Sequence, residues 1–120
     1  MKQDTEIMLN SFRDELGAVL GGNLEQIILY GSQCRGDETP DSDLDILIVL
    51  GDASQGWRDK VHQIAYRLMW HREFRPLISL NIIDREYYQL LRDAGSSYLG
   101  NILREGKPLW SADKTNISIG

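Results

Sequence analysis

The segment Tyr30–Leu50, YGSQCRGDETPDSDLDILIVL, constrains the fold of this chain more than any other stretch. It ends in an uninterrupted apolar run, ILIVL, which is typical of a central strand covered on both faces. Residues two apart in a strand project from the same face, so Asp43 and Asp45 point together while Leu44 faces the opposite layer. We therefore expect two carboxylates side by side at the beginning of a buried strand.

The residues before this strand indicate a function for the two carboxylates. Two negative charges so close repel each other, and a divalent cation with oxygen ligands relieves the repulsion. Gly31 and Ser32 follow a short apolar strand expected over residues 26–30, QIILY. Gly31 lets backbone N–H groups approach an anion, and a helix beginning near Ser32 would direct its N–H groups and the serine hydroxyl at that anion. With Arg35 on the first turn of this helix, the segment predicts a site for a metal-bound triphosphate.

Each of these signals has an ordinary structural interpretation when it is taken singly. A Gly-Ser pair marks many turns, Asp-x-Asp marks many solvated strand ends, and Arg35 equally suits a salt bridge that shapes the loop. Cys34 suits a small packing residue better than a thiol activated at a helix start. His62 and His71 are not three or four residues apart, the spacing that pairs two ligands on one helix face. The order Gly-Ser, then Asp-x-Asp, between two apolar strands is what indicates a functional site.

The hydrophobic pattern predicts the order helix, strand, helix, strand, helix, strand, helix, helix. The expected elements are a helix over 4–20, strands over 26–30, 43–50 and 77–83, a short helix after Ser32, a long helix over 57–74, and two short helices within 84–110. We expect an α/β (α+β) fold, a small mixed β-sheet of three or more strands flanked by helices. Residues 1–110 should form a single domain, and residues 111–120 a flexible tail.

The chain resembles the minimal nucleotidyltransferase (MNT) group of the DNA polymerase β superfamily, which carries Gly-Ser, a spacer and Asp-x-Asp in a strand. The resemblance covers most of the chain, including the segment REGKPLW at Arg104–Trp110. It implies the polymerase β-type nucleotidyltransferase fold, with Gly31 and Ser32 binding nucleotide phosphates. It also implies that Asp43 and Asp45 are the catalytic residues and hold two Mg²⁺ ions that bridge the triphosphate of ATP or another NTP.

One position departs from the family pattern. Members usually carry a third carboxylate on the next strand, which here is LISLNII over 77–83 and contains no acid. Ser79 stands where the family's Asp is expected, and Asn81 is the other polar side chain on that face. Neither serves as a general base near neutral pH, and either is a weaker Mg²⁺ ligand than a carboxylate. Asp84 and Glu86 are expected to cap the following helix instead.

The composition of the chain limits the kinds of partner and the cellular compartment that we expect. A formal net charge of −5 disfavours direct binding to nucleic acid, which depends on clustered Lys and Arg. The single cysteine excludes an internal disulfide, and no apolar stretch suits a signal peptide or a membrane span. We expect a cytoplasmic domain that acts alone or in a homo- or hetero-oligomer.

Two functions remain open at this stage. The first, by resemblance, is Mg²⁺-dependent transfer of AMP from ATP to a hydroxyl of a partner protein, as the MNT antitoxin of a small helical HEPN toxin. The second is a nucleotidyltransferase-like module, weak or inactive in catalysis, that binds and neutralises or scaffolds its partner by contact. The intact Gly31, Ser32, Asp43 and Asp45 favour the first, and the neutral Ser79 favours the second. A polymerase or tRNA-end enzyme would need further domains.

Overall fold

The structure, a computed structural model, describes residues 3–31 and 43–112. Its elements in chain order are α1 (Gln3–Leu20), the 3₁₀ turn η1 (Gly21–Asn23), β1 (Leu24–Tyr30), β2 (Leu44–Leu50), α3 (Gln55–His71), β3 (Ile78–Asp84), α4 (Arg85–Asp93), α5 (Ser97–Glu105) and β4 (Lys107–Ser111). The expected helices and strands within the described ranges are present, with ends shifted by a few residues. The short helix expected after Ser32 lies outside the described residues, as does most of the expected tail.

The four strands form one mixed sheet in the order β3-β2-β1-β4. β1 pairs antiparallel with both β2 and β4, whereas β2 pairs parallel with β3. β2 is therefore an inner strand with neighbours on both sides, as its unbroken apolar run predicts. The expected mixed sheet and fold class are confirmed.

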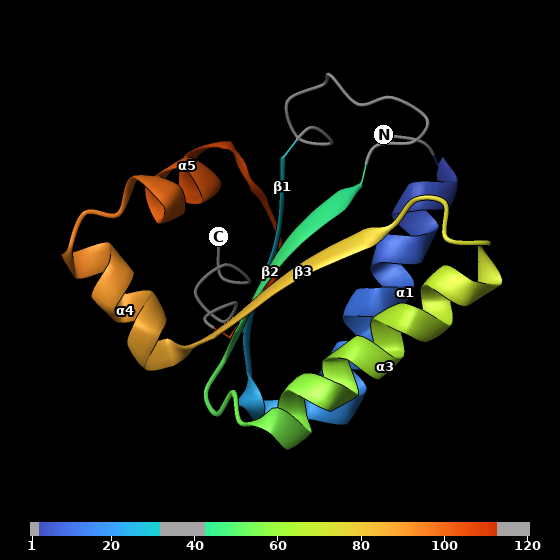
Figure 1. The fold of residues 1–120 in the computed structure, drawn as a ribbon, viewed down its shortest axis with the longest axis horizontal. Helices are drawn as coiled ribbons and strands as arrows, with labels where there is room; N and C mark the ends of the chain where they lie inside the picture. The colour runs from blue at the N-terminus through green and yellow to red at the C-terminus, as the bar shows by residue number, and fades with distance from the viewer. Residues whose placement is uncertain (1–2, 32–42, 113–120) are drawn as a thin grey trace, which may run out of the picture.

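Helices cover both faces of this sheet (Figure 1). α1 and α3 pack on one face, against the side chains of β2 at Leu44, Ile46, Ile48 and Leu50. α4 and α5 cover the other face, where Leu47 and Val49 point. Because alternate residues of a strand face opposite sides, Asp45 projects on the α4/α5 face. Each fully buried Leu or Ile of this strand contributes about 1.5–3 kcal/mol by leaving water, which fixes the strand beneath Asp45.

The fourth strand was not expected from the sequence. Lys107–Ser111 pairs with β1, and the register joins Ile28 to Pro108 and Ile27 to Trp110. Gly106 permits the chain to enter this strand, because a Cβ atom there would lie 2.4 Å from the carbonyl oxygen of Ile102 and 2.8 Å from Cγ2 of Ile28. Proline is tolerated at a sheet edge, which is where β4 lies.

Local polar contacts define where α4 and α5 begin. The Asp84 carboxylate accepts a hydrogen bond from the backbone N–H of Tyr87 at 2.7 Å, which confirms Asp84 as a helix cap. The Ser96 hydroxyl accepts one from the N–H of Leu99 at 3.2 Å. Within the described part of the chain, no helix combines the length and apolar character needed to cross a bilayer.

Candidate functional site

Asp45 occupies the centre of a row of three side chains across the sheet. It is the register partner of Tyr30 in the antiparallel pair with β1 and of Ser79 in the parallel pair with β3. Directly paired residues project from the same face, so all three side chains lie on the α4/α5 side. Asp45 is half-buried at this position. The apolar sheet therefore holds a carboxylate at the edge of the core, between one phenol and one hydroxymethyl group.

Gly31 lies directly against this carboxylate. Its φ of 82° falls in the left-handed region, which side chains rarely adopt. A Cβ atom built on Gly31 would lie 2.2 Å from Oδ2 of Asp45, far closer than any non-bonded contact. The requirement for glycine is thus both conformational and steric. The end of β1 brings a backbone without a side chain against Asp45. The binding of phosphate by Gly31 stays a prediction.

Asp43 is exposed and directly precedes β2, two residues before Asp45. The described residues contain no group of three or more His, Cys, Asp or Glu side chains arranged to hold a metal ion. A pair of carboxylates nevertheless suits Mg²⁺, because this ion keeps several waters and commonly takes one or two carboxylates together with substrate phosphates. The two acids therefore fit a metal ion that arrives with a nucleotide better than one held permanently by the protein.

Ser79, the residue expected at the third-carboxylate position, is the register partner of Asp45. Ser79 is exposed on β3 opposite Asp45, and Asn81 follows on the same face opposite Leu47. The amide nitrogen of Asn81 donates a hydrogen bond to the hydroxyl of Tyr98 on α5. Asn81 thus links β3 to α5, and Ser79 is the residue of β3 nearest in register to the acids.

A cluster of polar side chains beside Asp45 was missed by the sequence analysis. It consists of Tyr30, Tyr98 and Asn81, contributed by β1, α5 and β3. Burial raises the pKa of Tyr30 above its ordinary value, and a hydrogen bond to Tyr98 and the negative charge of Asp45 raise it further. Tyr30 therefore remains a neutral hydrogen-bond donor throughout the physiological pH range.

A small cavity of about 220 Å³ opens beside this cluster. Its lining residues come from the end of β1 and from α5: Tyr30, Gly31, Tyr98, Asn101, Ile102 and Glu105. The cavity therefore extends from the glycine that contacts Asp45 to the C-terminal half of α5. It offers aromatic, amide and carboxylate groups next to the predicted phosphate-binding turn.

Three of the candidates named from sequence, Ser32, Cys34 and Arg35, lie outside the described residues, and their roles stay predictions. His62 and His71 are both exposed on α3, which covers the opposite face of the sheet from Asp45. The structure thus brings together Gly31, Asp45 and Ser79 and does not bring either histidine to them.

The fold and this arrangement of glycine, acids and parallel strand are those of a nucleotidyltransferase domain. The family model described as "Nucleotidyltransferase domain" matches residues 9–93, and the chain belongs to this family. It is 31% identical over 105 residues to the provisionally named protein adenylyltransferase MJ0604 of Methanocaldococcus jannaschii, with 88% of this chain and 97% of that protein covered. A second protein of that organism, MJ0141, carries the same provisional name and is 26% identical over 91 residues, covering 73% of this chain and 92% of that protein.

Solved structures share the fold at lower sequence identity. A nucleotidyltransferase-like protein of Sulfolobus solfataricus matches with a TM-score of 0.56 and 21% identity, covering 90% of this chain and 81% of that one. A chain in a toxin–antitoxin structure with AMP-PNP matches with a TM-score of 0.55 and 21% identity, covering 90% of this chain and 77% of that one. A chain in a structure of tri-AMPylated Shewanella oneidensis HEPN toxin with MNT antitoxin matches with a TM-score of 0.50 and 19% identity. The match covers 92% of this chain and 76% of that one. The expected polymerase β-type fold and the resemblance to MNT antitoxins are confirmed.

Proposed function

We propose that this chain transfers AMP from ATP, with Mg²⁺, to a hydroxyl of a partner protein, and that it does so as the antitoxin of a HEPN-type toxin in the cytoplasm. The observation that carries the proposal is the contact of Gly31 with Asp45, two residues after Asp43. It places a side-chain-free turn against a carboxylate pair, as a metal-bound triphosphate requires. The names of the two archaeal relatives and the family model support transfer of a nucleotide.

The residues of this chain have distinct parts in the proposed reaction. Asp43 and Asp45 would hold Mg²⁺, which neutralises charge on the triphosphate during in-line displacement. Gly31 leaves room for phosphate oxygens beside them. The oxygen of the acceptor hydroxyl forms a bond to the α-phosphorus, the bond from this phosphorus to the β-phosphate oxygen breaks, and pyrophosphate leaves. The hydroxyl proton passes to water, because Ser79 is not a base near neutral pH.

The partner assignment has separate support. Structures with this fold include a toxin–antitoxin complex with AMP-PNP and a HEPN toxin carrying three AMP groups beside an MNT antitoxin. Transfer to a protein hydroxyl on such a partner is consistent with the net charge of −5, which does not favour a nucleic-acid acceptor.

The neutral residue at position 79 favours a second candidate function. Loss of the carboxylate opposite Asp45 removes both a metal ligand and a base, and general-base catalysis is worth roughly 10²–10⁴ in rate. A chain without efficient transfer would still bind a partner by contact. Ser79 is the specific observation in favour of this alternative.

Co-expression with the protein encoded by the neighbouring reading frame separates the two functions. We expect a complex in which intact mass measurement shows AMP adducts on the neighbour, and we expect no adducts with Asp43→Asn/Asp45→Asn. A stable complex without adducts would support the contact-only function. The absence of any complex would contradict the antitoxin assignment.

A further inference from the structure

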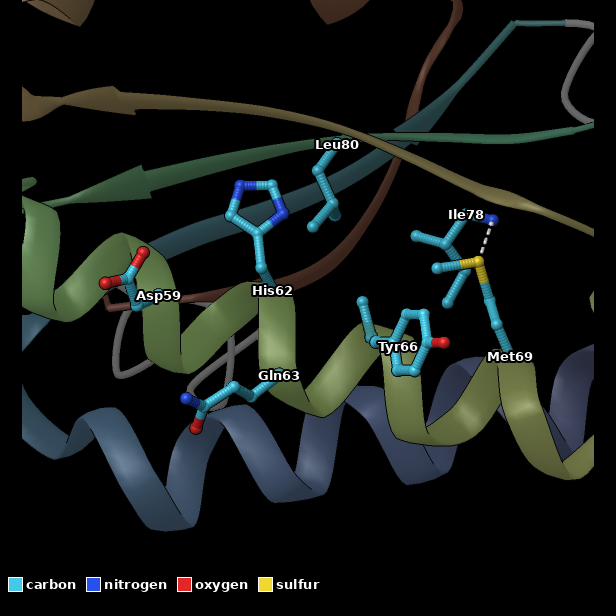
Figure 2. Close-up of a pocket in the computed structure, with 8 residues that line it drawn as sticks. Asp59, His62, Gln63, Tyr66, Met69, Ile78 and Leu80 are labelled. Atoms are coloured by element: carbon cyan, nitrogen blue, oxygen red, sulfur yellow. Dashed lines mark hydrogen bonds between the residues drawn. The ribbon is translucent and has the colours of Figure 1, made fainter.

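A large hollow in the described part of the chain lies away from the acids, between α3 and β3. It has a volume of about 550 Å³ and is lined by Asp59, His62, Tyr66, Met69, Ile78 and Leu80, among others. Figure 2 shows His62 of α3 pointing toward Leu80 of the strand and Met69 of α3 pointing toward Ile78. Since β3 is the outermost strand of the sheet, the hollow lies along a sheet edge. We call it the edge groove.

The backbone of β3 presents hydrogen-bonding groups along this groove. The N–H of Leu44 donates to the carbonyl of Leu77 at 2.8 Å, so alternate residues of β3, beginning with Leu77, bond to β2 and the others point outward. Two of the outward groups have partners: the N–H of Ile78 meets Sδ of Met69 at 3.1 Å, and the carbonyl of Ile82 accepts from Nη1 of Arg58 at 3.0 Å. Leu80 lies between them. Its outward N–H and carbonyl have no side-chain partner among the described residues.

Exposed aromatic side chains continue from one end of the groove. Tyr66 and Trp70 of α3 are 55% and 63% exposed, and Leu77 beside them is 46% exposed. Tyr66, Trp70 and Phe74 contact one another with ring centroids 5.5–6.3 Å apart. The three rings form one aromatic cluster at the surface, and exposed apolar clusters commonly mark protein contacts.

The charge around the groove is opposite to that of the whole chain. Residues 55–77 carry five Lys and Arg side chains against two acids, although the formal net charge of the chain is −5. Arg67 is paired with Glu15 and Arg58 is bonded to backbone carbonyls. Lys60, Arg72 and Arg75 are the other cations of this segment, and its two acids are Asp59, which lines the groove, and Glu73. A ligand of this surface is therefore expected to carry negative charge.

We propose that the edge groove binds an extended, acidic segment of a partner protein, which adds to the sheet beside β3. A strand placed there would bond to the N–H and carbonyl of Leu80 and direct every second side chain toward α3. One large apolar side chain fits the 550 Å³ hollow. Acidic side chains of the same segment would be attracted by the net positive charge of residues 55–77. The site lies on the other face of the sheet from Asp45 and does not depend on nucleotide transfer.

A protein segment fits these observations better than a single-stranded nucleic acid. Bases stack on open ring faces, whereas Phe74 packs edge to face against both Tyr66 and Trp70, with interplanar angles of 63° and 87°. The outward backbone groups of Leu80 match another strand, since main-chain bonding at a sheet edge is a recurring mode of peptide recognition.

An array of synthetic ten-residue peptides tests the proposal. The central residue is Phe, Leu, Ala or Lys, and alternate flanking residues are all Glu or all Lys. We expect the Phe peptide with Glu flanks to bind best and to shift the amide resonance of Leu80 and the side-chain resonances of Tyr66 and His62 in NMR spectra. Tyr66→Lys should weaken binding by about tenfold or more, since it removes an aromatic wall of the groove.

Two controls make the result specific. Tyr87 is 50% exposed on α4, on the other side of the sheet, and Tyr87→Lys should leave peptide binding unchanged. Asp43→Asn/Asp45→Asn should also bind the peptide normally, which separates this site from the proposed nucleotide site. Failure of every peptide to bind, a preference for Lys flanks, or equal binding by Tyr66→Lys would overturn the proposal. If a ten-nucleotide oligouridine binds at Tyr66 more tightly than the best peptide, the proposal is overturned in favour of a nucleic-acid ligand.

Discussion

Asp45 of β2 and Ser79 of β3 are direct register partners in the parallel part of the sheet, and both project toward α4 and α5. The residue opposite the proposed metal-binding acid is thus a hydroxyl group, at the position where we expect the third carboxylate of a nucleotidyltransferase. The proposed site therefore offers two acids to a metal-bound nucleotide and a neutral side chain where a third acid is expected.

Ser79→Asp should restore the missing carboxylate. Because Ser79 is exposed and adjacent in register to Asp45, the added acid can reach a shared metal ion without disturbing the core. We expect transfer of labelled AMP to rise by about tenfold or more, within the range of general-base catalysis. Asn81→Asp, two residues further along the same face, is the matched control and should give no gain. Equal activity of Ser79→Asp and the unmodified chain, with both folded, would show that position 79 is not the third carboxylate position.

Asp43→Asn/Asp45→Asn should abolish Mg²⁺-dependent binding of AMP-PNP and leave the fold intact. The substitution removes two anionic ligands but preserves the size of both side chains. The melting temperature should stay the same or rise slightly, because repulsion between like charges is lost. Isothermal titration calorimetry measures the binding, and Asp14→Asn/Asp93→Asn, with one substitution on α1 and one on α4, controls for the loss of two negative charges. Metal-dependent binding that survives in the double variant would remove the metal-site assignment.

Gly31→Ala should damage the site more than an ordinary glycine substitution. A side chain at a φ of 82° costs about 1–2 kcal/mol, and the added Cβ atom would also displace the Asp45 carboxylate. Gly95→Ala provides the comparison, since Gly95 has a φ of 67° and open space around it. Both variants should lose similar stability in chemical denaturation, but only Gly31→Ala should weaken Mg²⁺-dependent nucleotide binding. Equal nucleotide binding by the two variants would show that the contact with Asp45 has no functional consequence.

Tyr30 should control stability at high pH. Its folded-state pKa is raised, so the folded chain retains this proton where the unfolded chain has lost it, above about pH 10. The contribution is fully present below the unfolded pKa and is lost as pH rises toward the folded pKa. Ultraviolet titration should show one of the five tyrosines ionising much later than the rest. Tyr30→Phe should remove that late step and reduce the loss of unfolding free energy as pH rises. Five similar tyrosine transitions in the wild-type chain would contradict this account.

The sequence was sufficient to predict the parts of the fold that rest on local pattern. The run ILIVL identified β2 as a buried strand, and the two-residue period placed Asp45 on the opposite face from Leu44 and Ile46. The shared face of Asp43 and Asp45 stays a prediction, because Asp43 precedes the strand. The same period placed Ser79 and Asn81 together on β3. These predictions needed no knowledge of distant contacts, since each follows from the geometry of a single strand.

The features that were missed depend on contacts between segments far apart in the chain. β4 is short and contains Pro108, so nothing in its pattern indicates a strand until Gly106 brings it against β1. The cluster of Tyr30, Tyr98 and Asn81 likewise forms only because α5 crosses the face that carries Asp45. Glycine before a Lys-Pro pair was the one local signal that could have suggested the close approach of β4.

Transfer of label from α-labelled ATP to the purified protein encoded by the neighbouring reading frame, with Mg²⁺ present, tests the central claim most directly. We predict label on a hydroxyl side chain of the neighbour, lost on chelation of Mg²⁺ and lost with Asp43→Asn/Asp45→Asn. A stable complex that acquires no label under any of these conditions would contradict nucleotide transfer and leave binding by contact as the function of this chain.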